Sequence, residues 1–289
     1  MAIFVHNNLH TNRVAATATK IAAAALAVAA MVSTAACGSQ NAQDPNQKTI
    51  TPGVLTIGTA QPTYTPWMYD NKPENGKGYE SAVAYAVAKK LGYSKDKVKW
   101  VRTTFDSAVT PGPKDFDFNL QQFSITAERK KAVDFSPSYY NATQGVVVKK
   151  DSKFANAKTL ADLKTAQIGA MVGTTSYSFA KDKIKSDIQT FNDNDALVQA
   201  LDSKQIDALV IDTPSSVNIV RSKQVKDGVV LGQIAGSEDK EGTGLVLPKG
   251  SKLTADVTKA VNALEKDGTL KKLQEKWLAE YTTDVPVLK

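Results

Sequence analysis

Histidine and cysteine are almost missing from this chain of 289 residues. The two histidines are His6 and His10, and the single cysteine is Cys37. All three lie in or at the edge of an N-terminal leader, so we expect the mature chain to keep no histidine. This absence excludes Ser-His-Asp and Cys-His catalysis and any histidine metal site from the mature chain. A single cysteine cannot form a disulfide within one chain, and we expect neither a cofactor nor a metal.

Long blocks of like charge are also missing. The chain has 36 basic and 29 acidic residues, a net charge of +7. Because the lysines are scattered, they do not indicate a nucleic-acid-binding arm. A basic surface of this kind is compatible with an anionic membrane or cell wall. Hydrophobic residues make up 42% of the chain and charged residues 22%, which is typical of a soluble protein with real cores, and the length predicts two compact units.

Residues 1–36 have the organisation of a signal peptide. Arg13 and Lys20 give a basic n-region, and the apolar run at 21–32 has the length of an h-region. The sequence Thr-Ala-Ala-Cys that ends at Cys37 resembles the lipobox of bacterial lipoproteins, with threonine where leucine is usual. We therefore expect cleavage before Cys37 and a lipid anchor on it. The alternative is an uncleaved anchor helix, for which the apolar run is short.

Strand and helix patterns alternate along the rest of the chain. In the first unit we expect strands at residues 54–59, 98–101 and 116–120, with a helix at 81–91. The β-α-β order predicts an α/β fold with a mostly parallel sheet covered by helices. The later expected elements are strands at 145–149, 167–171, 188–191, 208–211 and 244–247, and helices at 160–165, before 184, at 194–201, 253–266 and 269–278.

The stretch FSITAERKKAVDFS, residues 123–136, is the most informative part of the sequence. Ser124 and Thr126 are good helix N-caps, and Arg129 follows in the first helical turn. An arginine is unexpected there, because that end of the helix dipole prefers acidic side chains. One explanation is an anionic ligand, since a guanidinium holds a carboxylate through two parallel hydrogen bonds. The alternative is a solvated basic surface.

The order S-x-T-x-x-R, followed by a short helix, V-D-F-S and an aromatic pair, resembles the amino-acid-binding proteins of bacterial ABC importers. These proteins are family 3 of the extracellular solute-binding proteins and have the type II periplasmic-binding-protein fold. The resemblance extends from about Val54 to Tyr281. It implies two Rossmann-like lobes joined by a two-segment hinge, with the chain crossing near residues 141–145 and 236–242.

The implied domain boundaries follow from this resemblance. The composition of residues 37–48 is that of a flexible tether. Lobe 1 is expected at residues 49–143 plus 240–289, and lobe 2 at 144–239.

The resemblance also implies how the carboxylate of a free amino acid would be bound. Arg129 and Ser124 would hold it from one lobe. The Gly173-Thr174-Thr175 turn would bind the same carboxylate from the other lobe, because N–H groups at a helix start favour an anion. The turn lacks the spacing of a nucleotide-binding loop. The alternative for this turn is an ordinary capped helix.

The ligand's ammonium group would lie between Asp212 and Gln122. Asp212 matches the aspartate that the family uses for this purpose. The alternative is a plain N-cap before the Thr213-Pro214 helix start. With Arg129 on the carboxylate and Asp212 on the ammonium, the two lobes would hold opposite ends of the amino-acid backbone.

The pocket for the ligand's side chain is expected to be polar. Gln61 stands where binders of basic amino acids tend to carry an acidic residue, which argues against arginine or lysine as the ligand. We expect a neutral polar side chain, with glutamine first. The motifs AERKKAVDFS, IDTPS and LPKGS also resemble glutamine-type members. An acidic amino acid or cystine is the alternative ligand, and core packing is the alternative role of the aromatic residues. The expected lining residues are Gln61, Tyr64, Trp67, Phe105, Gln121 and Met171.

These features predict a monomeric, lipid-anchored binding protein on the outer face of the cytoplasmic membrane, not an enzyme. It would deliver a free amino acid to an ABC permease and would not bind nucleic acid. One alternative is an enzyme on the same fold, such as a dehydratase of a cyclic acid. Another is a sensor or adhesion lobe, which predicts a fused membrane or signalling domain.

If Cys37 carries the lipid, Cys37→Ala should give an unprocessed or released protein, because the acyl acceptor is lost. Membrane fractionation and gel migration of the wild type and the variant check this. Identical behaviour of the two proteins would contradict acylation at Cys37.

Overall fold

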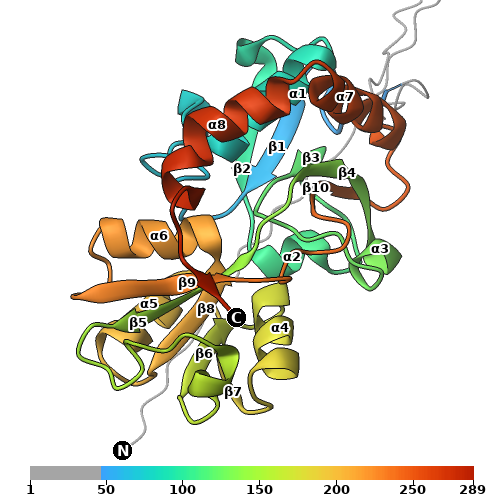
Figure 1. The fold of residues 1–289 in the computed structure, drawn as a ribbon. Helices are drawn as coiled ribbons and strands as arrows, with labels where there is room; N and C mark the ends of the chain where they lie inside the picture. Colours follow the sequence, from blue (N-terminus) through green and yellow to red (C-terminus); the bar gives the residue numbers. More distant parts are fainter. Residues whose placement is uncertain (1–46) are drawn as a thin grey trace, which may run out of the picture. The chain divides into compact units, whose positions relative to one another are not determined.

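The computed structural model describes residues 47–289, and Cys37, the expected signal peptide and most of the expected tether lie outside this range. The described chain forms two sheets of five and six strands. We use lobe 1 for the first sheet with helices α1, α2, α3, α7 and α8, and lobe 2 for the second sheet with α4, α5 and α6 (Figure 1). Among residues 47–289, no helix is both long enough and apolar enough to cross a membrane.

The first sheet has the order β2-β1-β3-β10-β4. Strands β1, β2 and β3 are parallel, and β10 runs antiparallel to β3 and β4. Its strands are β1 (Leu55–Thr59), β2 (Val98–Arg102), β3 (Phe118–Asn119), β4 (Val133–Tyr140) and β10 (Thr243–Pro248). Strand β10 shows why both faces are covered: Leu245 and Leu247 belong to one hydrophobic core, and Val246 between them belongs to another.

The second sheet has the order β11-β9-β5-β8-β6-β7. Strands β6, β7 and β8 are parallel, and β5 is antiparallel to both β8 and β9. Its strands are β5 (Gln144–Lys149), β6 (Ile168–Met171), β7 (Ile188–Phe191), β8 (Ala208–Asp212), β9 (Gly228–Ile234) and β11 (Val287–Leu288). The run Val146-Val147-Val148 again alternates between two cores, so this sheet is also covered on both faces.

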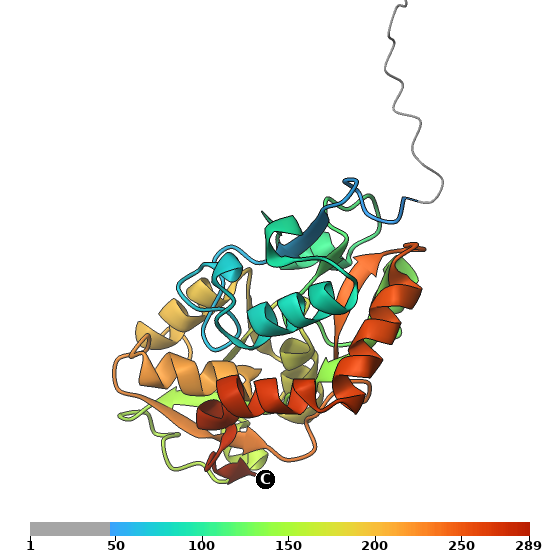
Figure 2. The same cartoon turned by 90° about the horizontal axis from the view of Figure 1, so that it is seen from above.

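Helices α1, α7 and α8 pack against one another in lobe 1 (Figure 2). Helices α4, α5 and α6 pack on the second sheet, and α6 also contacts α8 of lobe 1 (Figure 1). The helices are α1 (Tyr79–Lys90), α2 (Phe105–Val109), α3 (Arg129–Ala132), α4 (Thr175–Lys183), α5 (Asn194–Asp202), α6 (Thr213–Arg221), α7 (Thr254–Lys266) and α8 (Thr269–Thr282). Short 3₁₀ turns occur at η1 (Pro73–Asn75), η2 (Lys95–Lys97) and η3 (Leu160–Leu163).

Within residues 47–289, the chain passes between the two sheets three times rather than twice. The links from β4 to β5 and from β9 to β10 coincide with the crossings expected near 141–145 and 236–242. The third link leads from α8 to β11, which pairs with β9 in the second sheet. The expectation that residues 240–289 lie wholly in lobe 1 is therefore wrong for the last residues. The other lobe boundaries stay predictions.

Candidate functional site

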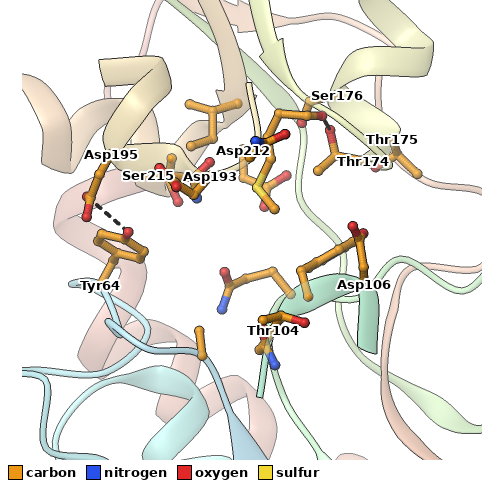
Figure 3. Close-up of a pocket in the computed structure, with 18 of the residues that line it drawn as sticks. Tyr64, Thr104, Asp106, Thr174, Thr175, Ser176, Asp193, Asp195, Asp212 and Ser215 are labelled. Atoms are coloured by element: carbon orange, nitrogen blue, oxygen red, sulfur yellow. Dashed lines mark hydrogen bonds between the residues drawn. The ribbon is translucent and has the colours of Figure 1, made fainter. Parts of the chain in front are cut away.

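A cavity of about 420 Å³ lies between the two lobes. This volume is within the range of roughly 300–1,000 Å³ that is usual for small-molecule sites. Its walls are loops that follow β1, β2 and β3 in lobe 1 and β6, β7 and β8 in lobe 2. Open α/β sheets bind ligands at the carboxyl ends of their strands, and here two such edges face each other. Figure 3 shows Thr104 and Asp106 on one side of the cavity and Asp212 and Ser176 on the other.

Most residues predicted for the site line this one cavity. They come from both halves of the chain and from loops separated by whole strands and helices. The predicted residues that line it are Gln61, Tyr64, Phe105, Gln121, Gln122, Ser124, Arg129, Met171, Thr174, Thr175 and Asp212.

Trp67 is the predicted pocket residue that lies elsewhere. Its side chain is 2% exposed and packs in the lobe 1 core against Tyr79 and Tyr140. It borders a smaller adjoining cavity instead. Its indole Nε1 donates a hydrogen bond to Ser215 Oγ of lobe 2 at 2.9 Å, so it contacts the other lobe. For this residue the core-packing alternative describes the structure better.

Arg129 is half-buried at the start of α3, and its guanidinium contacts both lobes. It donates to Ser124 O at 2.8 Å and to Gly173 O at 3.0 Å. Its guanidinium carbon lies 5.1 Å from the centre of the Phe105 ring, within the range of a cation–π contact. Burial lowers the pKa of Arg129, with nearby aspartates opposing the shift. These contacts do not fit a solvated surface residue.

The turn before α4 presents backbone and hydroxyl groups from lobe 2. Gly173 has a φ of 74°, a left-handed conformation that glycine adopts without steric cost. Thr174 caps α4, because its Oγ1 accepts the N–H of Tyr177 at 3.1 Å. The Thr175 hydroxyl meets the Ser124 hydroxyl across the cleft at 2.9 Å. The turn is therefore a capped helix start that also reaches the opposite lobe.

Asp212 ends β8 and precedes α6, but its side chain makes no helix-capping hydrogen bond. Its Oδ1 accepts a hydrogen bond from Gln144 Nε2 at 3.3 Å. Desolvation raises the pKa of Asp212 to about 7, and the charge of Asp239 adds to the shift, while the Gln144 bond and Arg129 oppose it. Because burial disfavours the ionised form of this carboxylate, a cation bound next to it would stabilise the ionised form.

Asp239 was missed by the sequence reasoning. It lies in the link between β9 and β10, and Asn141 Nδ2 of the other main link donates to its backbone carbonyl at 3.1 Å. Burial raises the pKa of its carboxyl, and hydrogen bonds from Ser124 and Thr175 and the charge of Arg129 oppose this. The sequence feature that could have indicated Asp239 is its position between Gly236 and Gly242, in a segment expected to cross between the lobes.

Three further aspartates that line the cavity were also missed: Asp106, Asp193 and Asp195. All three are exposed. Asp193 caps α5, accepting the N–H of Ala196 at 2.7 Å. Asp195 accepts the Tyr64 hydroxyl of lobe 1 at 3.0 Å (Figure 3). Each follows the end of a parallel strand, and this position in the sequence could have indicated that it lies at the cavity. No cluster of His, Cys, Asp and Glu among residues 47–289 is arranged to hold a metal ion.

The model of the bacterial extracellular solute-binding proteins, family 3, matches residues 55–280. The chain belongs to this family, as its sequence motifs predicted. The two-sheet α/β architecture confirms the predicted type II periplasmic-binding-protein fold.

Three similar proteins illustrate the family. The arginine-binding extracellular protein ArtP of Bacillus subtilis (strain 168) is 33% identical over 87% of this chain and 96% of its own length. The L-cystine-binding protein TcyJ of Escherichia coli (strain K12) is 30% identical over 80% of this chain and 85% of its own. The solved structure of the ancestral amino acid-binding protein AncCDT-1, a precursor of cyclohexadienyl dehydratase, is 34% identical with a TM-score of 0.63, covering 78% of this chain and 96% of its own.

Replacing Arg129 with alanine should weaken binding of the best amino-acid ligand by about 30-fold to several thousand-fold. Removing one partner of a buried charge pair costs about 2–5 kcal/mol, which corresponds to this range of dissociation constants. Arg129→Lys should also lose affinity, because lysine lacks the planar fork. Isothermal titration calorimetry measures both effects.

Lys130→Ala is the matched control for this experiment. Lys130 is the next residue of α3 and pairs with Glu241 at the exposed surface, where an ion pair contributes little. Equal affinities of wild type, Arg129→Ala and Lys130→Ala would contradict a binding role for Arg129.

Amino-acid affinity should fall as pH drops through about 7, the raised pKa of Asp212. A bound ammonium favours the ionised carboxylate, so binding must expel a proton from Asp212 below that pH. Affinity would then fall by up to about tenfold per pH unit. Calorimetry between pH 5 and 8 checks this, and Asp212→Asn should make the profile less steep, while Glu80, whose pKa burial also raises to about 7, still titrates in this range. A profile of equal slope in wild type and variant would mean that Asp212 does not meet the ammonium.

Proposed function

We propose that this protein is the substrate-binding component of an ABC importer, which captures a polar amino acid between its lobes and delivers it to a membrane permease. One observation carries the proposal: Arg129 of lobe 1 and Asp212 of lobe 2 line the same cavity. A free amino acid is a zwitterion, so its two charged ends complement a cation and an anion on opposite walls. Arg129 is the lining cation on the lobe 1 side among residues 47–289, and Asp212 is a buried carboxylate on the lobe 2 side.

In the proposed complex the α-carboxylate binds Arg129, whose guanidinium lies between the lobes. Ser124, Thr174 and Thr175 add hydroxyl or backbone donors, and the start of α4 adds N–H groups that favour an anion. The α-ammonium lies between Asp212 and Gln122. This assignment follows the resemblance of these positions to the family's binding residues and the shared cavity that they line.

The side-chain end of the cavity favours a ligand that donates hydrogen bonds. Gln61, Tyr64 and Gln121 line the cavity, and their amide and hydroxyl groups suit a neutral polar side chain. Glutamine is the reference ligand on this reasoning, because its side-chain amide donates and accepts.

A second candidate is a cationic amino acid, arginine or lysine. The exposed carboxylates Asp106, Asp193 and Asp195 line the cavity together with Asp212, whereas Arg129 is its only cationic lining residue among residues 47–289. Four carboxylates against one guanidinium leave an excess of negative charge that a cationic side chain would offset. Binding of arginine by a similar protein supports this candidate.

Hydrogen bonds between the lobes support closure around the ligand. Tyr64 reaches Asp195, Trp67 reaches Ser215, and the Ser124 hydroxyl meets Thr175. A ligand that contacts both lobes adds to these bonds only when the lobes are closed, so it shifts the equilibrium towards the closed state. A permease can recognise a closed, loaded protein by this difference.

We further infer that the protein acts outside the cell as a monomer, held at the cytoplasmic membrane by a lipid on Cys37. The lipobox-like sequence before Cys37 and the polar tether after it support this part of the proposal. Two or three acyl chains hold a protein stably at a membrane, whereas one binds weakly.

A dehydratase is the alternative from another functional class, since a related ancestral binding protein is described as the precursor of one. Such chemistry needs an acid–base group near the substrate. Asp212, whose pKa is raised to about 7, is the lining residue suited to that role. A binding protein would release the bound molecule unchanged, whereas a dehydratase would release a product.

Calorimetry with glutamine, arginine, lysine, glutamate and cystine should give the tightest binding for a ligand whose side chain donates hydrogen bonds. Glutamate should bind weakly, because its side-chain carboxylate would meet the cavity's own carboxylates. Nuclear magnetic resonance of the recovered ligand should show no chemical change. Tightest binding of glutamate would contradict the side-chain assignment, and conversion of the ligand would contradict a binding-only function.

A further inference from the structure

Glu80 is a buried carboxylate that lies just outside the proposed binding site. It is in the first turn of α1 and is 1% exposed. Its Oε1 accepts the backbone N–H of Gln122 at 2.7 Å and also the hydroxyl of Tyr139. Its Oε2 accepts the side-chain amide of Gln122. Within residues 47–289, two of the three hydrogen bonds to the Glu80 carboxylate therefore come from a single residue that lines the cavity.

Gln122 has a backbone conformation that needs support. Its φ is 52°, in the left-handed region that residues with a Cβ atom adopt only at a steric cost. It lies in the loop after β3, which ends at Asn119, and it lines the cavity between the lobes. The bond from its N–H to Glu80 Oε1 stabilises this conformation. The backbone of a cavity residue thus depends on a carboxylate in the protein interior.

The side chain of Gln122 is oriented by the same carboxylate. A glutamine amide has one donor nitrogen and one acceptor oxygen, and an ionised carboxylate can only accept. The nitrogen must therefore face Glu80 Oε2, which fixes the orientation of the amide. The structure gives no hydrogen-bond donor to Gln122 Oε1 among residues 47–289, so this oxygen is available as an acceptor.

We propose that Glu80 is a positioning residue that holds Gln122 so that its amide oxygen accepts a hydrogen bond from the ligand's α-ammonium group. The proposal rests on the proposed function, because it assigns a source for one ammonium contact. Asp212 supplies an acceptor from lobe 2, and Gln122 supplies one from lobe 1. On the lobe 1 side the acceptor is thus the neutral amide of Gln122. Its orientation is set by the buried carboxylate of Glu80, which does not itself contact the ligand.

Asp117 offers a matched control for a purely structural role. It is also buried, at 2% exposure, and it also accepts backbone N–H groups, from Thr56 at 2.7 Å and Ile50 at 2.8 Å. Like Glu80, it belongs to lobe 1, and burial raises the pKa of both carboxyls. Its partners do not line the cavity. Losing its charge should therefore affect folding without affecting ligand recognition.

The test is a double-mutant cycle measured by calorimetry at about pH 8, above the raised pKa of Glu80 of about 7. The proteins are wild type, Glu80→Gln, Gln122→Gly, the double variant and Asp117→Asn, each with the tightest-binding amino acid found in the panel above. Glu80→Gln and Gln122→Gly should each weaken binding by about tenfold or more, the loss of one good hydrogen bond to a charged group. The double variant should be no worse than either single variant, because both remove the same contact.

A second ligand separates positioning from general loosening of the fold. The des-amino analogue of the same amino acid lacks the ammonium group, so wild type should bind it much more weakly. Glu80→Gln should reduce the ratio of the two affinities, whereas Asp117→Asn should leave the ratio unchanged even if its melting temperature falls. A loss of stability alone would lower the affinities for the amino acid and for its des-amino analogue by the same factor.

The outcomes are distinguishable. If wild type binds none of the amino acids, the proposed function fails and this inference fails with it. If wild type binds and Glu80→Gln keeps the wild-type ratio, or if the two single effects add in the double variant, the inference alone is overturned. If Glu80→Gln does not fold, Gln122→Gly decides, since unchanged affinity in that variant would remove the contact that Glu80 is proposed to position.

Discussion

The position of one guanidinium decides the geometry of the cleft. Arg129 donates to a carbonyl of each lobe, Ser124 O and Gly173 O, while its face lies on the Phe105 ring. A planar donor group held by three contacts has little freedom to rotate. A donor group that is already restricted loses less entropy when it binds a ligand. The left-handed turn at Gly173 is what brings the second carbonyl within reach.

Several buried carboxylates lie close together at or beside the cavity. Burial raises the pKa of Asp212 and Glu80 to about 7 and also raises that of Asp239. Each of these groups is disfavoured as an anion by desolvation and stabilised by hydrogen-bond donors. Arg129 offsets part of the charge at Asp212 and Asp239. A bound ammonium group would supply a further positive charge next to these carboxylates. The contact that recognises the ligand would therefore also stabilise the ionised carboxylates.

The sequence predicted what depends on local patterns. The position of Arg129, Thr174 and Asp212 in one cavity could be predicted because each follows a strand within a short motif, and parallel strands bring such motifs to one edge. Trp67, Asp239 and Glu80 were misplaced or missed, because their partners lie far along the chain. Strand β9 was missed because Gly232 interrupts its apolar pattern, and β11 because two residues carry no periodic signal. Distant pairing leaves no trace in a single sequence.

The short tail strand also protects an edge of the molecule. Without β11, strand β9 would be the outer strand of the second sheet, and an open edge invites pairing with another chain. Gln233 N instead donates to Pro286 O at 2.8 Å and Ala235 N to Leu288 O at 3.2 Å. Gly232 permits this approach, because a Cβ there would lie 2.6 Å from Pro286 O. The last residues of the chain therefore cover the C-terminal end of β9, where Gln233 and Ile234 pair with Val287 and Leu288.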